Sequence, residues 1–533
     1  MMNIFFTVVF FSFLIWVFRN VLFWVALWQD KEYRLDRLSV HFRETLQGRK
    51  IFTSPVNIFK WLLLIAYIFI GLNDVWMLWY ELVVGIFFIL QALVVCKDVL
   101  THRIKRPVFT LKALIILFLS IVGLTLVTIS PLVNPYAWLL FVDRLVPVMI
   151  SLFVFFFFFP TEIQRDITIR KATRKMQEYK DVLVIAVSGS YGKTSTKEYI
   201  AQVLGRKYAV VKTPLSNNTP IGIANTILNK IHENTEIFVV EMGAYKKGEI
   251  EELTRIVKPI ISVTTAISDQ HISLYGSLAN VVDSEYELIA ALPKEGLSLF
   301  NGNSNLMDQL FEKTKGKKIY YKWYSHAVPK NAIIGASNVK PTLDGVSFDV
   351  TIKGETFHCF APLLGIHVVE NILPAIFLAK KQGMKIQEII KAVSVLQPPP
   401  QTMVKRELQN GVVGIDDTFN ASPESVFSAM EYLQLHKKKR ICVLGPLTEL
   451  GKNAKERHFQ IGVKAAQCCD YFFLLNKNFS DDIIRGVKSK KSNCYVEIDR
   501  PEKVAEICKN GTKRGDVILF EGKEAKMVMK KLL

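Results

Sequence analysis

The stretch AVSGSYGKTSTKEYI, residues 186–200, places a glycine-rich turn between two segments of different character. The apolar run DVLVIAV (181–187) before it predicts a buried strand, and TKEYIAQVLG (196–205) after it predicts a helix. Backbone N–H groups in such a loop and at the following helix N-terminus bind phosphates. The stretch therefore predicts a site for a nucleotide triphosphate. Its predicted contacts are Gly189, Ser190, Gly192, Lys193, Thr194 and Ser195.

Lys193 and Thr194 have the side chains that phosphate binding needs. The lysine is expected to neutralise the outer phosphates, and the threonine hydroxyl to bind Mg²⁺. Gly189 and Gly192 stand closer together than the generic GxxxxGK pattern requires. The plain alternative is a glycine-rich turn with a surface lysine, but the strand–loop–helix context favours the phosphate site.

Two further strands deliver polar residues to the same predicted sheet edge. EIFVVE ends in Glu241, and IISVTTAIS leads into His271. The carboxyl ends of parallel strands share one edge, where α/β proteins bind ligands. A single such Glu or His is more often solvated or structural. The three together, with Thr194, predict a Mg²⁺ site.

The remaining sequence predicts two α/β domains separated by the proline-rich run LQPPPQTM, because consecutive prolines cannot continue a helix. We expect a first α/β domain over 182–397 and a second over 398–533. The second contains strand-like runs such as RICVLG and DVILFEG. With 533 residues, the chain is too long for one core, so several domains are expected.

Several motifs in this region resemble those of the Mur ligases, the ATP-dependent amide ligases of peptidoglycan synthesis. In chain order they are GSYGKTS, EMGAYKKGEI, HISLYGSLANV, GIHVVENILPA, IDDTFNASPESV and VLGPLTELG. The resemblance covers about residues 182–533. It implies a central P-loop ATPase domain followed by a C-terminal Rossmann-like α/β domain, with ATP and Mg²⁺ as cofactors.

The resemblance also assigns roles to residues. It makes Lys193 a phosphate ligand, Thr194 and Glu241 ligands of Mg²⁺, and His271 the ligand of a second Mg²⁺. Lys193, Glu241 and His271 are then the catalytic residues. Asn371 would contact adenine, and Asp416 or Asp417 the ribose.

Several places depart from the family's pattern, among them position 285 and the segment 521–526. The family commonly has a carbamylated lysine fourteen residues after that histidine, and this chain has Glu285 there. Glu285 is either a Mg²⁺ ligand that replaces the carbamate or a helix-surface acid. EGKEAK (521–526) replaces a more basic Lys-Gly-Ser-type loop, which leaves the acceptor's identity open.

Residues 1–160 are dominated by apolar side chains and predict a multi-span transmembrane domain. Alternate connections are rich in Lys and Arg, with six between 29 and 55 and four between 97 and 108. Five more follow the last span, so the positive-inside rule predicts an outside N-terminus and cytoplasmic α/β domains. The protein is therefore expected in the cytoplasmic membrane. The predicted spans are 3–28, 56–73, 75–96, 109–130 and 138–159.

Charges within the predicted spans allow two interpretations. Arg19, Asp143 and Arg144 interrupt apolar runs, and such residues often mark functional sites. Alternatively Asp143 and Arg144 lie at a membrane interface and Arg19 snorkels to it. Lys60 and Pro55 shorten the apolar run of the second span, which makes it the weakest of the five predicted spans.

The net charge of +19 is explained by membrane topology and anionic lipid rather than nucleic acid. The basic connector 161–181 is either a lipid-binding segment or a solvated helix face. The seven cysteines suggest neither zinc nor disulfides.

Three functions remain open at this point. The first is a membrane-anchored amide ligase that joins an amino acid or dipeptide to a small-molecule or lipid-linked peptide precursor. It is suggested because the family's UDP-gripping domain is replaced by membrane spans. The second is a ligase resembling poly-γ-glutamate or folylpolyglutamate synthetases. The third is a nucleotide-binding scaffold without turnover.

Overall fold

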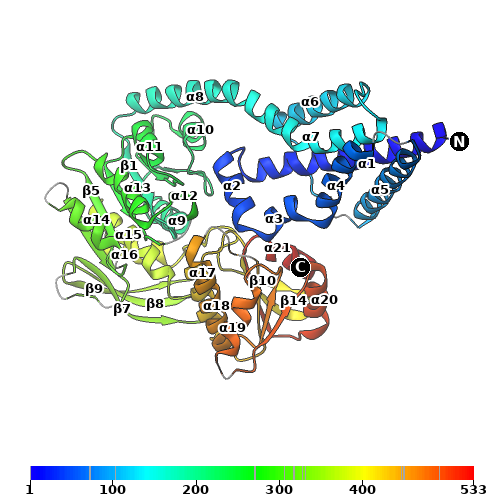
Figure 1. Ribbon diagram of the computed structural model, residues 1–533. Helices are drawn as coiled ribbons and strands as arrows, with labels where there is room; N and C mark the ends of the chain where they lie inside the picture. The colour runs from blue at the N-terminus through cyan, green and yellow to red at the C-terminus, as the bar shows by residue number, and fades with distance from the viewer. Residues whose placement is uncertain are drawn as a thin grey trace. The chain divides into compact units, whose positions relative to one another are not determined.

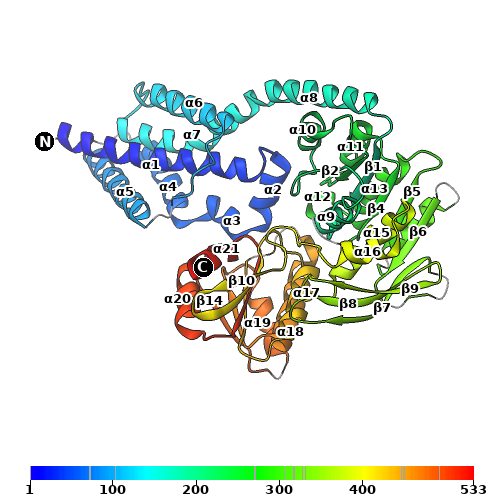
Figure 2. The ribbon, with the colours of Figure 1, turned by 180° about the vertical axis from the view of Figure 1, so that it is seen from behind.

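The computed structural model describes residues 2–70, 74–101, 104–268, 272–304, 306–315, 319–326, 328–329, 332–445, 447, 450–490 and 492–533. The chain divides into two compact units, residues 1–165 and 166–533. The boundary falls inside helix α8 (Phe158–Glu178), so the chain passes between the units through a continuous helix (Figures 1 and 2).

The first unit is entirely helical in its described part (Figure 1). Its elements are α1 (Met2–Asp30), α2 (Leu35–Glu44), α3 (Leu46–Thr53), α4 (Pro55–Ile70), α5 (Asp74–Leu100), α6 (Leu111–Thr128), α7 (Pro135–Phe156) and the start of α8. Five helical stretches in the described residues are long and apolar enough to cross a membrane: Ile4–Asp30, Gln47–Ile70, Asp74–Leu100, Leu111–Thr128 and Pro135–Glu178.

These long helices are apolar on all sides rather than on one stripe. In α5, Val84 and Phe88 are fully buried, whereas Trp76 and Leu93 are about 60% exposed. In water, an exposed apolar face of this extent is unfavourable, because burying a large apolar side chain gains roughly 1.5–3 kcal/mol. A helix apolar all round is typical of a membrane span.

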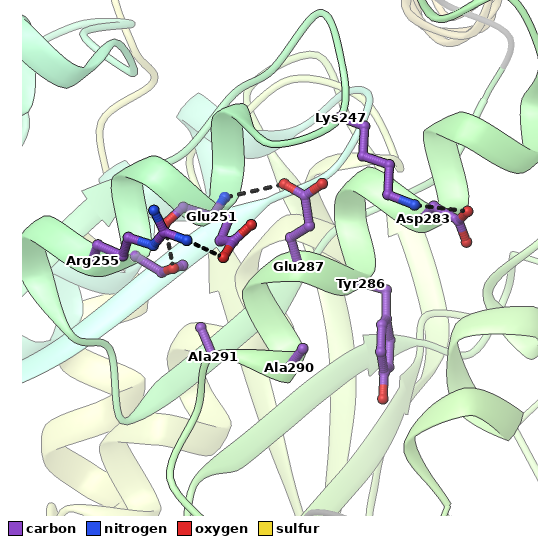
Figure 3. A pocket seen from close by; sticks show the side chains of 9 residues that line it. Lys247, Glu251, Arg255, Asp283, Tyr286, Glu287, Ala290 and Ala291 are labelled. Carbon is purple, nitrogen blue, oxygen red and sulfur yellow. Dashed lines mark hydrogen bonds and ion pairs between the residues drawn. The ribbon is translucent and has the colours of Figure 1, made fainter.

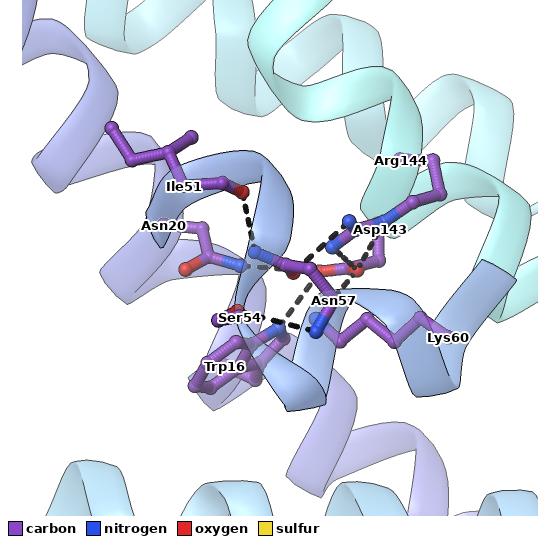
Figure 4. Close-up of polar contacts among 8 residues, drawn as sticks. All are labelled: Trp16, Asn20, Ile51, Ser54, Asn57, Lys60, Asp143 and Arg144. Carbon is purple, nitrogen blue, oxygen red and sulfur yellow. Dashed lines mark hydrogen bonds and ion pairs between the residues drawn. The ribbon is translucent and has the colours of Figure 1, made fainter. Parts of the chain in front are cut away.

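The charged residues of this unit pair with one another. The Asp143 side chain is buried inside the helical unit beside that of Lys60 (Figure 4). Lys60, which shortens the apolar run of the second span, supplies the counter-charge. Arg19 forms an ion pair with Asp98 at 3.6 Å.

The second unit begins with a largely parallel sheet. Among the described residues, its strand order is β2-β3-β1-β4-β5-β6-β7-β8-β9, with antiparallel pairing only at β7-β8 and β8-β9. The strands are β1 (Leu183–Ser188), β2 (Val210–Lys212), β3 (Ile237–Glu241), β4 (Ile261–Thr264), β5 (Leu297–Asn301), β6 (Ile319–Tyr324), β7 (Ile334–Pro341), β8 (Val346–Ile352) and β9 (Glu355–Ala361).

Helices cover both faces of this sheet, as parallel sheets require. Alternate residues of β1 enter different cores: Ile185 and Val187 pack with α9 and α15, and Val184 and Ala186 with α10 and α11. The helices are α9 (Lys193–Leu204), α10 (Pro220–Lys230), α11 (Glu249–Val257), α12 (Ile272–Tyr275), α13 (Leu278–Ala290), α14 (Met307–Thr314), α15 (Val368–Lys381) and α16 (Ile386–Val393).

A second sheet follows the proline-rich run, with the order β10-β11-β15-β12-β13-β14 in the described chain. Only the edge strand β10 is antiparallel to its neighbour. The strands are β10 (Val404–Leu408), β11 (Val412–Asp417), β12 (Arg440–Leu444), β13 (Tyr471–Leu474), β14 (Tyr495–Ile498) and β15 (Val517–Glu521). The helices between them are α17 (Pro423–Leu433), α18 (Ala454–Cys468), α19 (Ser480–Lys488) and α20 (Pro501–Gly511), and α21 (Ala525–Leu532) follows the last strand. The predicted class, a helical apolar region followed by α/β domains, is confirmed.

Candidate active site

The glycine-rich loop lies between β1 and α9, as the sequence predicted. Gly189 and Gly192 have φ angles of +126° and +79°, which L side chains rarely adopt. A Cβ at Gly189 would also lie 2.3 Å from Oγ1 of Thr265. Thr265 holds the loop by donating to the Tyr191 carbonyl at 2.5 Å. The backbone is therefore shaped as a cradle that only glycine permits at these positions.

Lys193 is the first residue of α9, and its ammonium group points back into the loop. Nζ donates to the carbonyl oxygens of Gly189 at 2.5 Å and Ser190 at 3.0 Å. The lysine is half-buried rather than a free surface side chain. This geometry favours the phosphate-site interpretation over a glycine-rich turn with a surface lysine.

Thr194 and Glu241 are brought together across two elements. Thr194 Oγ1 donates to Glu241 Oε2 at 3.0 Å. Glu241 is the last residue of β3, is 1% exposed, and neighbours β1 in parallel register. The pair places a hydroxyl and a carboxylate beside the phosphate loop, which is the oxygen chemistry that Mg²⁺ prefers.

Two residues that the sequence reading missed hold the Glu241 carboxylate. Lys197, fully buried one turn after Lys193, donates to Glu241 Oε2 at 3.2 Å and also bonds the Leu215 carbonyl. Asn218 Nδ2 donates to Oε1 at 3.3 Å. The i, i+4 spacing of the two lysines could have revealed Lys197, since such residues share a helix face. Nothing local distinguishes Asn218.

Glu285 in α13 is a buried acid, so the helix-surface interpretation is wrong. Its side chain is 4% exposed, and Oε2 has no hydrogen-bond partner. Burial raises the pKa of Glu285 to about 7, although the Lys193 charge and hydrogen bonds from Ser188 and Gly189 act to lower it. These neighbours place Glu285 beneath the phosphate loop. A buried, unpaired carboxylate oxygen at this position is suited to a cation.

Asn371 in α15 also lies against the loop. Its Oδ1 accepts a hydrogen bond from Thr196 Oγ1 at 3.2 Å, and it lies 2.6 Å from where a Gly192 Cβ would be. Ser195 stands in the first turn of α9, next to Thr194. Both residues therefore belong to the immediate surroundings of the loop.

Asp416 and Asp417 end strand β11 of the second sheet. Asp416 accepts from Thr418 Oγ1 at 2.6 Å and lies 3.6 Å from Arg406. Asp417 accepts from the Met403 amide at 3.2 Å. In the part of the chain with described contacts, these two acids bond to residues of their own sheet region rather than to the loop.

Asp417 also faces the buried Glu521 at the end of β15. Burial raises the pKa of Asp417 to about 7 and that of Glu521 well above its ordinary value, and the proximity of the two carboxyls adds to the shift at Glu521.

The donors around the loop fit ATP with Mg²⁺. His271, the predicted second ligand, lies outside the described residues. Within the described ranges, no group of three or more His, Cys, Asp or Glu side chains is arranged to hold a metal alone. Mg²⁺ commonly takes only one or two carboxylates and completes its coordination with phosphates and water. Thr194, Glu241 and the unpaired oxygen of Glu285 supply oxygens of this kind.

A groove of about 400 Å³ lies apart from this loop, between α11 and the outer face of α13 (Figure 3). Glu287 accepts from the backbone amides of Gly248 and Glu251 at 2.7 and 3.1 Å. Lys247 pairs with Asp283, and Arg255 with Glu251. Its charges satisfy one another, so the groove is not the candidate active site.

Comparison with known proteins agrees with this geometry. The Mur ligase middle domain matches residues 187–379, and the Mur ligase glutamate ligase domain matches residues 402–524. The UDP-N-acetylmuramoyl-tripeptide–D-alanyl-D-alanine ligase of Bacillus subtilis is 31% identical over 63% of this chain and 72% of its own length. The Synechocystis enzyme of the same name is 32% identical over 63% and 71%.

Solved structures show the same fold. MurF from Acinetobacter baumannii superposes with a TM-score of 0.63 and 20% identity, covering 69% of this chain and 80% of its own. MurF from Thermotoga maritima, solved with ADP, gives 0.60 and 23%, covering 69% and 82%. Together with the geometry of the glycine-rich loop, these matches show that the chain belongs to the Mur ligase family of ATP- and Mg²⁺-dependent acid–amino-acid ligases.

Proposed function

We propose that the protein is a membrane-embedded ligase that joins an amine, D-alanyl-D-alanine foremost, to a carboxylate of a cell-envelope precursor. The relatives named above carry D-alanyl-D-alanine ligase in their names. The observation that carries the proposal is the Lys193–Thr194–Glu241 site in a chain whose described residues include five helical stretches long enough to span a membrane.

The proposed reaction has two steps. The precursor carboxylate attacks the γ-phosphorus of ATP, which forms an acyl phosphate and releases ADP. The amine then attacks the acyl carbon, the C–N bond forms, and phosphate leaves after the amine has lost a proton. The first step brings two anions together, so positive charge at the phosphates contributes more than proton transfer.

The site residues have distinct parts in this proposal. Lys193 binds the phosphates. When ATP binds, its ammonium group replaces its hydrogen bonds to the loop carbonyls with hydrogen bonds to phosphate oxygens. Thr194, Glu241 and Glu285 hold Mg²⁺, which neutralises phosphate charge when bound. Lys197 keeps the Glu241 carboxylate in place from its buried side. His271, Asn371, Asp416 and Asp417 keep their predicted roles toward the second Mg²⁺, adenine and ribose.

We further propose that the helical unit spans the cytoplasmic membrane, with the N-terminus outside and the ligase domains in the cytoplasm. Connections rich in Lys and Arg alternate with connections around 73–74 and 130–136 that have neither, which supports this orientation. Exposed Ile163 and Ile167 of α8 share a helix face with Arg170 and Arg174 further along. That order suits a helix leaving the acyl region toward anionic headgroups.

ADP release by the detergent-purified protein with Mg²⁺ tests the ligase proposal. The acceptors are soluble UDP-muramoyl tripeptide and lipid-linked precursor extract, each with D-alanyl-D-alanine or glutamate. Lys193→Ala is expected to lower the rate about 10²–10³-fold, the scale measured for losing one transition-state charge contact. Lys230→Ala, an exposed lysine of α10, is the matched control and should leave the rate unchanged.

The choice of substrates separates the alternatives. Release that requires glutamate and not D-alanyl-D-alanine would place the protein with the poly-γ-glutamate and folylpolyglutamate type of ligase. No release with any pair, despite ATP binding, would replace the ligase proposal by a nucleotide-binding scaffold. Stimulation by the lipid-linked extract alone would make the membrane unit part of substrate selection.

A further inference from the structure

A cluster of polar side chains is buried in the helical unit, and the ligase reaction does not use it. It contains Trp16 and Asn20 of α1, Asn57 and Lys60 of α4, and Asp143 and Arg144 of α7, and is called the Asp143 cluster below (Figure 4). The side chains of Lys60 and Asp143 are fully buried. Three helices distant in sequence therefore meet around one carboxylate.

The Asp143 carboxylate is saturated with donors. Oδ1 accepts from Trp16 Nε1 at 2.7 Å and from Asn20 Nδ2 at 3.1 Å. Oδ2 accepts from Lys60 Nζ at 2.8 Å and from Arg144 at 3.1 Å (Nε) and 2.5 Å (Nη2). A buried ion pair needs such additional hydrogen bonds to offset its desolvation.

The charges of the Asp143 cluster do not balance. Lys60 and Arg144 each carry a positive charge, whereas Asp143 supplies one negative charge. Nearby Arg19 does not change the count, because it pairs with Asp98. The face of the Trp16 ring lies 4.5 Å from Lys60 Nζ and attracts it, but an indole carries no net charge. One positive charge is left over among apolar helices.

A charge without a counter-ion among apolar helices destabilises the fold, because its desolvation is not offset. A single lysine or arginine on Asp143 would already join the helices as a neutral pair. The second cation therefore goes beyond what helix packing requires. A cation retained at this cost is expected to meet an anion from outside the chain.

Arg144 is placed to meet that anion. Its side chain is 18% exposed, whereas Lys60 is fully enclosed. Its described hydrogen bonds, to Asp143 through Nε and Nη2 and to Asn57 Oδ1 through Nη1 at 3.1 Å, use three of the five guanidinium N–H donors. A guanidinium edge presenting parallel donors matches the oxygens of a phosphate.

We propose that the exposed edge of Arg144, backed by Lys60, binds the phosphate group of a membrane lipid. The inference rests on the proposed membrane embedding of the helical unit, and it specifies that this unit binds a lipid that carries a phosphate. The phosphate has two sources, the headgroup of an anionic phospholipid and the phosphate of a polyprenyl carrier that bears an envelope precursor. The bound phosphate brings the charge of the cluster to neutral or below.

Native mass spectrometry of the full-length protein in detergent tests the proposal. The probes are phosphatidylglycerol, polyprenyl phosphate, zwitterionic phosphatidylcholine and inorganic phosphate. Wild type is expected to retain one anionic lipid more tightly than phosphatidylcholine. Arg144→Gln should weaken that binding at least tenfold, because it leaves a neutral Lys60–Asp143 pair.

The controls distinguish a site from general charge attraction. Arg19→Gln removes a cation from the same helices but not from the Asp143 cluster, so it should keep the tightly bound lipid. Lys60→Gln is a second variant that lowers the cluster's charge without removing the guanidinium, and it should weaken binding as well. Each variant's thermal midpoint in detergent shows whether it is folded.

Each outcome decides the proposal. Tight binding of polyprenyl phosphate over phosphatidylglycerol supports the carrier as ligand, and equal binding supports the bulk phospholipid. Wild-type lipid affinity in folded Arg144→Gln, or equal losses in Arg144→Gln and Arg19→Gln, would overturn it. ADP release with a soluble acceptor is measured on the same samples. A wild-type protein that releases ADP normally but binds no anionic lipid more tightly than phosphatidylcholine refutes only this inference. Selective lipid binding without ADP release refutes only the proposed ligase.

Discussion

Two buried carboxylates, Asp143 in the helical unit and Glu285 in the ligase unit, differ in how completely their oxygens are hydrogen-bonded. Asp143 is 1% exposed and accepts hydrogen bonds from four side chains. Glu285 is 4% exposed, yet one of its oxygens has no partner. The two carboxylates are therefore similarly buried, but Asp143 is fully hydrogen-bonded and Glu285 keeps an oxygen without a partner.

This difference indicates that the two carboxylates have different roles. A buried acceptor without a partner costs roughly 1–3 kcal/mol, so a fold retains one mainly where a ligand completes it. A carboxylate that gathers donors from three helices instead fixes how those helices meet. In the Asp143 cluster, the carboxylate has all its partners, and it is the positive charge that is left unbalanced.

Removing the charge of Asp143 is expected to have the largest effect on this comparison. Asp143→Asn leaves Lys60 and Arg144 without a counter-ion, and breaking a buried pair costs about 3–5 kcal/mol. The thermal midpoint in detergent should fall strongly, and anionic lipid should restore part of it. Asp98→Asn, which affects a more exposed pair, is the matched control. An unchanged midpoint in Asp143→Asn would show that the cluster does not join the helices.

Changing Glu285 is expected to have an intermediate effect, on rate rather than on stability. Glu285→Gln removes the negative charge of a proposed Mg²⁺ ligand and should lower ADP release roughly tenfold, the equivalent of about 1.4 kcal/mol. Because the pKa of Glu285 is raised to about 7, its ionised fraction grows as pH rises through 7. Wild-type release should therefore increase between about pH 6 and 8, and the glutamine variant should lose that increase.

Bicarbonate sharpens the same test. The wild-type rate should be unchanged by bicarbonate in CO₂-stripped buffer, since a glutamate needs no carbamylation. Glu285→Lys should release ADP only when bicarbonate is supplied. A wild-type rate that depends on bicarbonate would contradict the assignment of Glu285 to Mg²⁺.

The smallest effect is expected at the second buried acid pair, Asp417 and Glu521. Both pKa values are raised in the folded state, so the pair's contribution to stability is complete below the unfolded pKa values and is lost as pH rises through the folded ones. Glu521→Gln should stabilise the protein at pH 8, by about 0.5–1 kcal/mol, and change little at pH 4. Thermal unfolding at both pH values measures this. Exposed Glu502→Gln is the control, and a stabilisation equal at both pH values would exclude titration as the cause.

Local sequence patterns predicted much of the architecture. Apolar runs long enough to span a membrane predicted five helices close to the observed stretches, because hydropathy depends on composition alone. The strand–loop–helix at 181–205 predicted the cradle between β1 and α9, because its glycines sit where φ is positive. Glu241 was found because it ends a strand.

Side-chain partners could not be predicted in the same way. Lys60 and Asp143 are 83 residues apart, and no local pattern links them. Lys197 and Asn218 meet Glu241 only after α9, β3 and the loop before α10 have packed. The burial of Glu285 depends on which face of α13 turns toward β1. The neighbouring acids Asp283 and Glu287 did not indicate from the sequence that Glu285 would be on the buried face.

The apolar helices, the α/β alternation, the phosphate loop and the order of the family's motifs could all be predicted from the amino-acid sequence, since residue periodicity and backbone preference are local properties of the chain. Which charges are neutralised became evident only in the packed fold. Burial makes a carboxylate depend on its neighbours in space: it saturated Asp143, left Glu285 with an open oxygen, and set Asp417 against Glu521. Neighbours in space are set by packing, which the order of residues along the chain does not display.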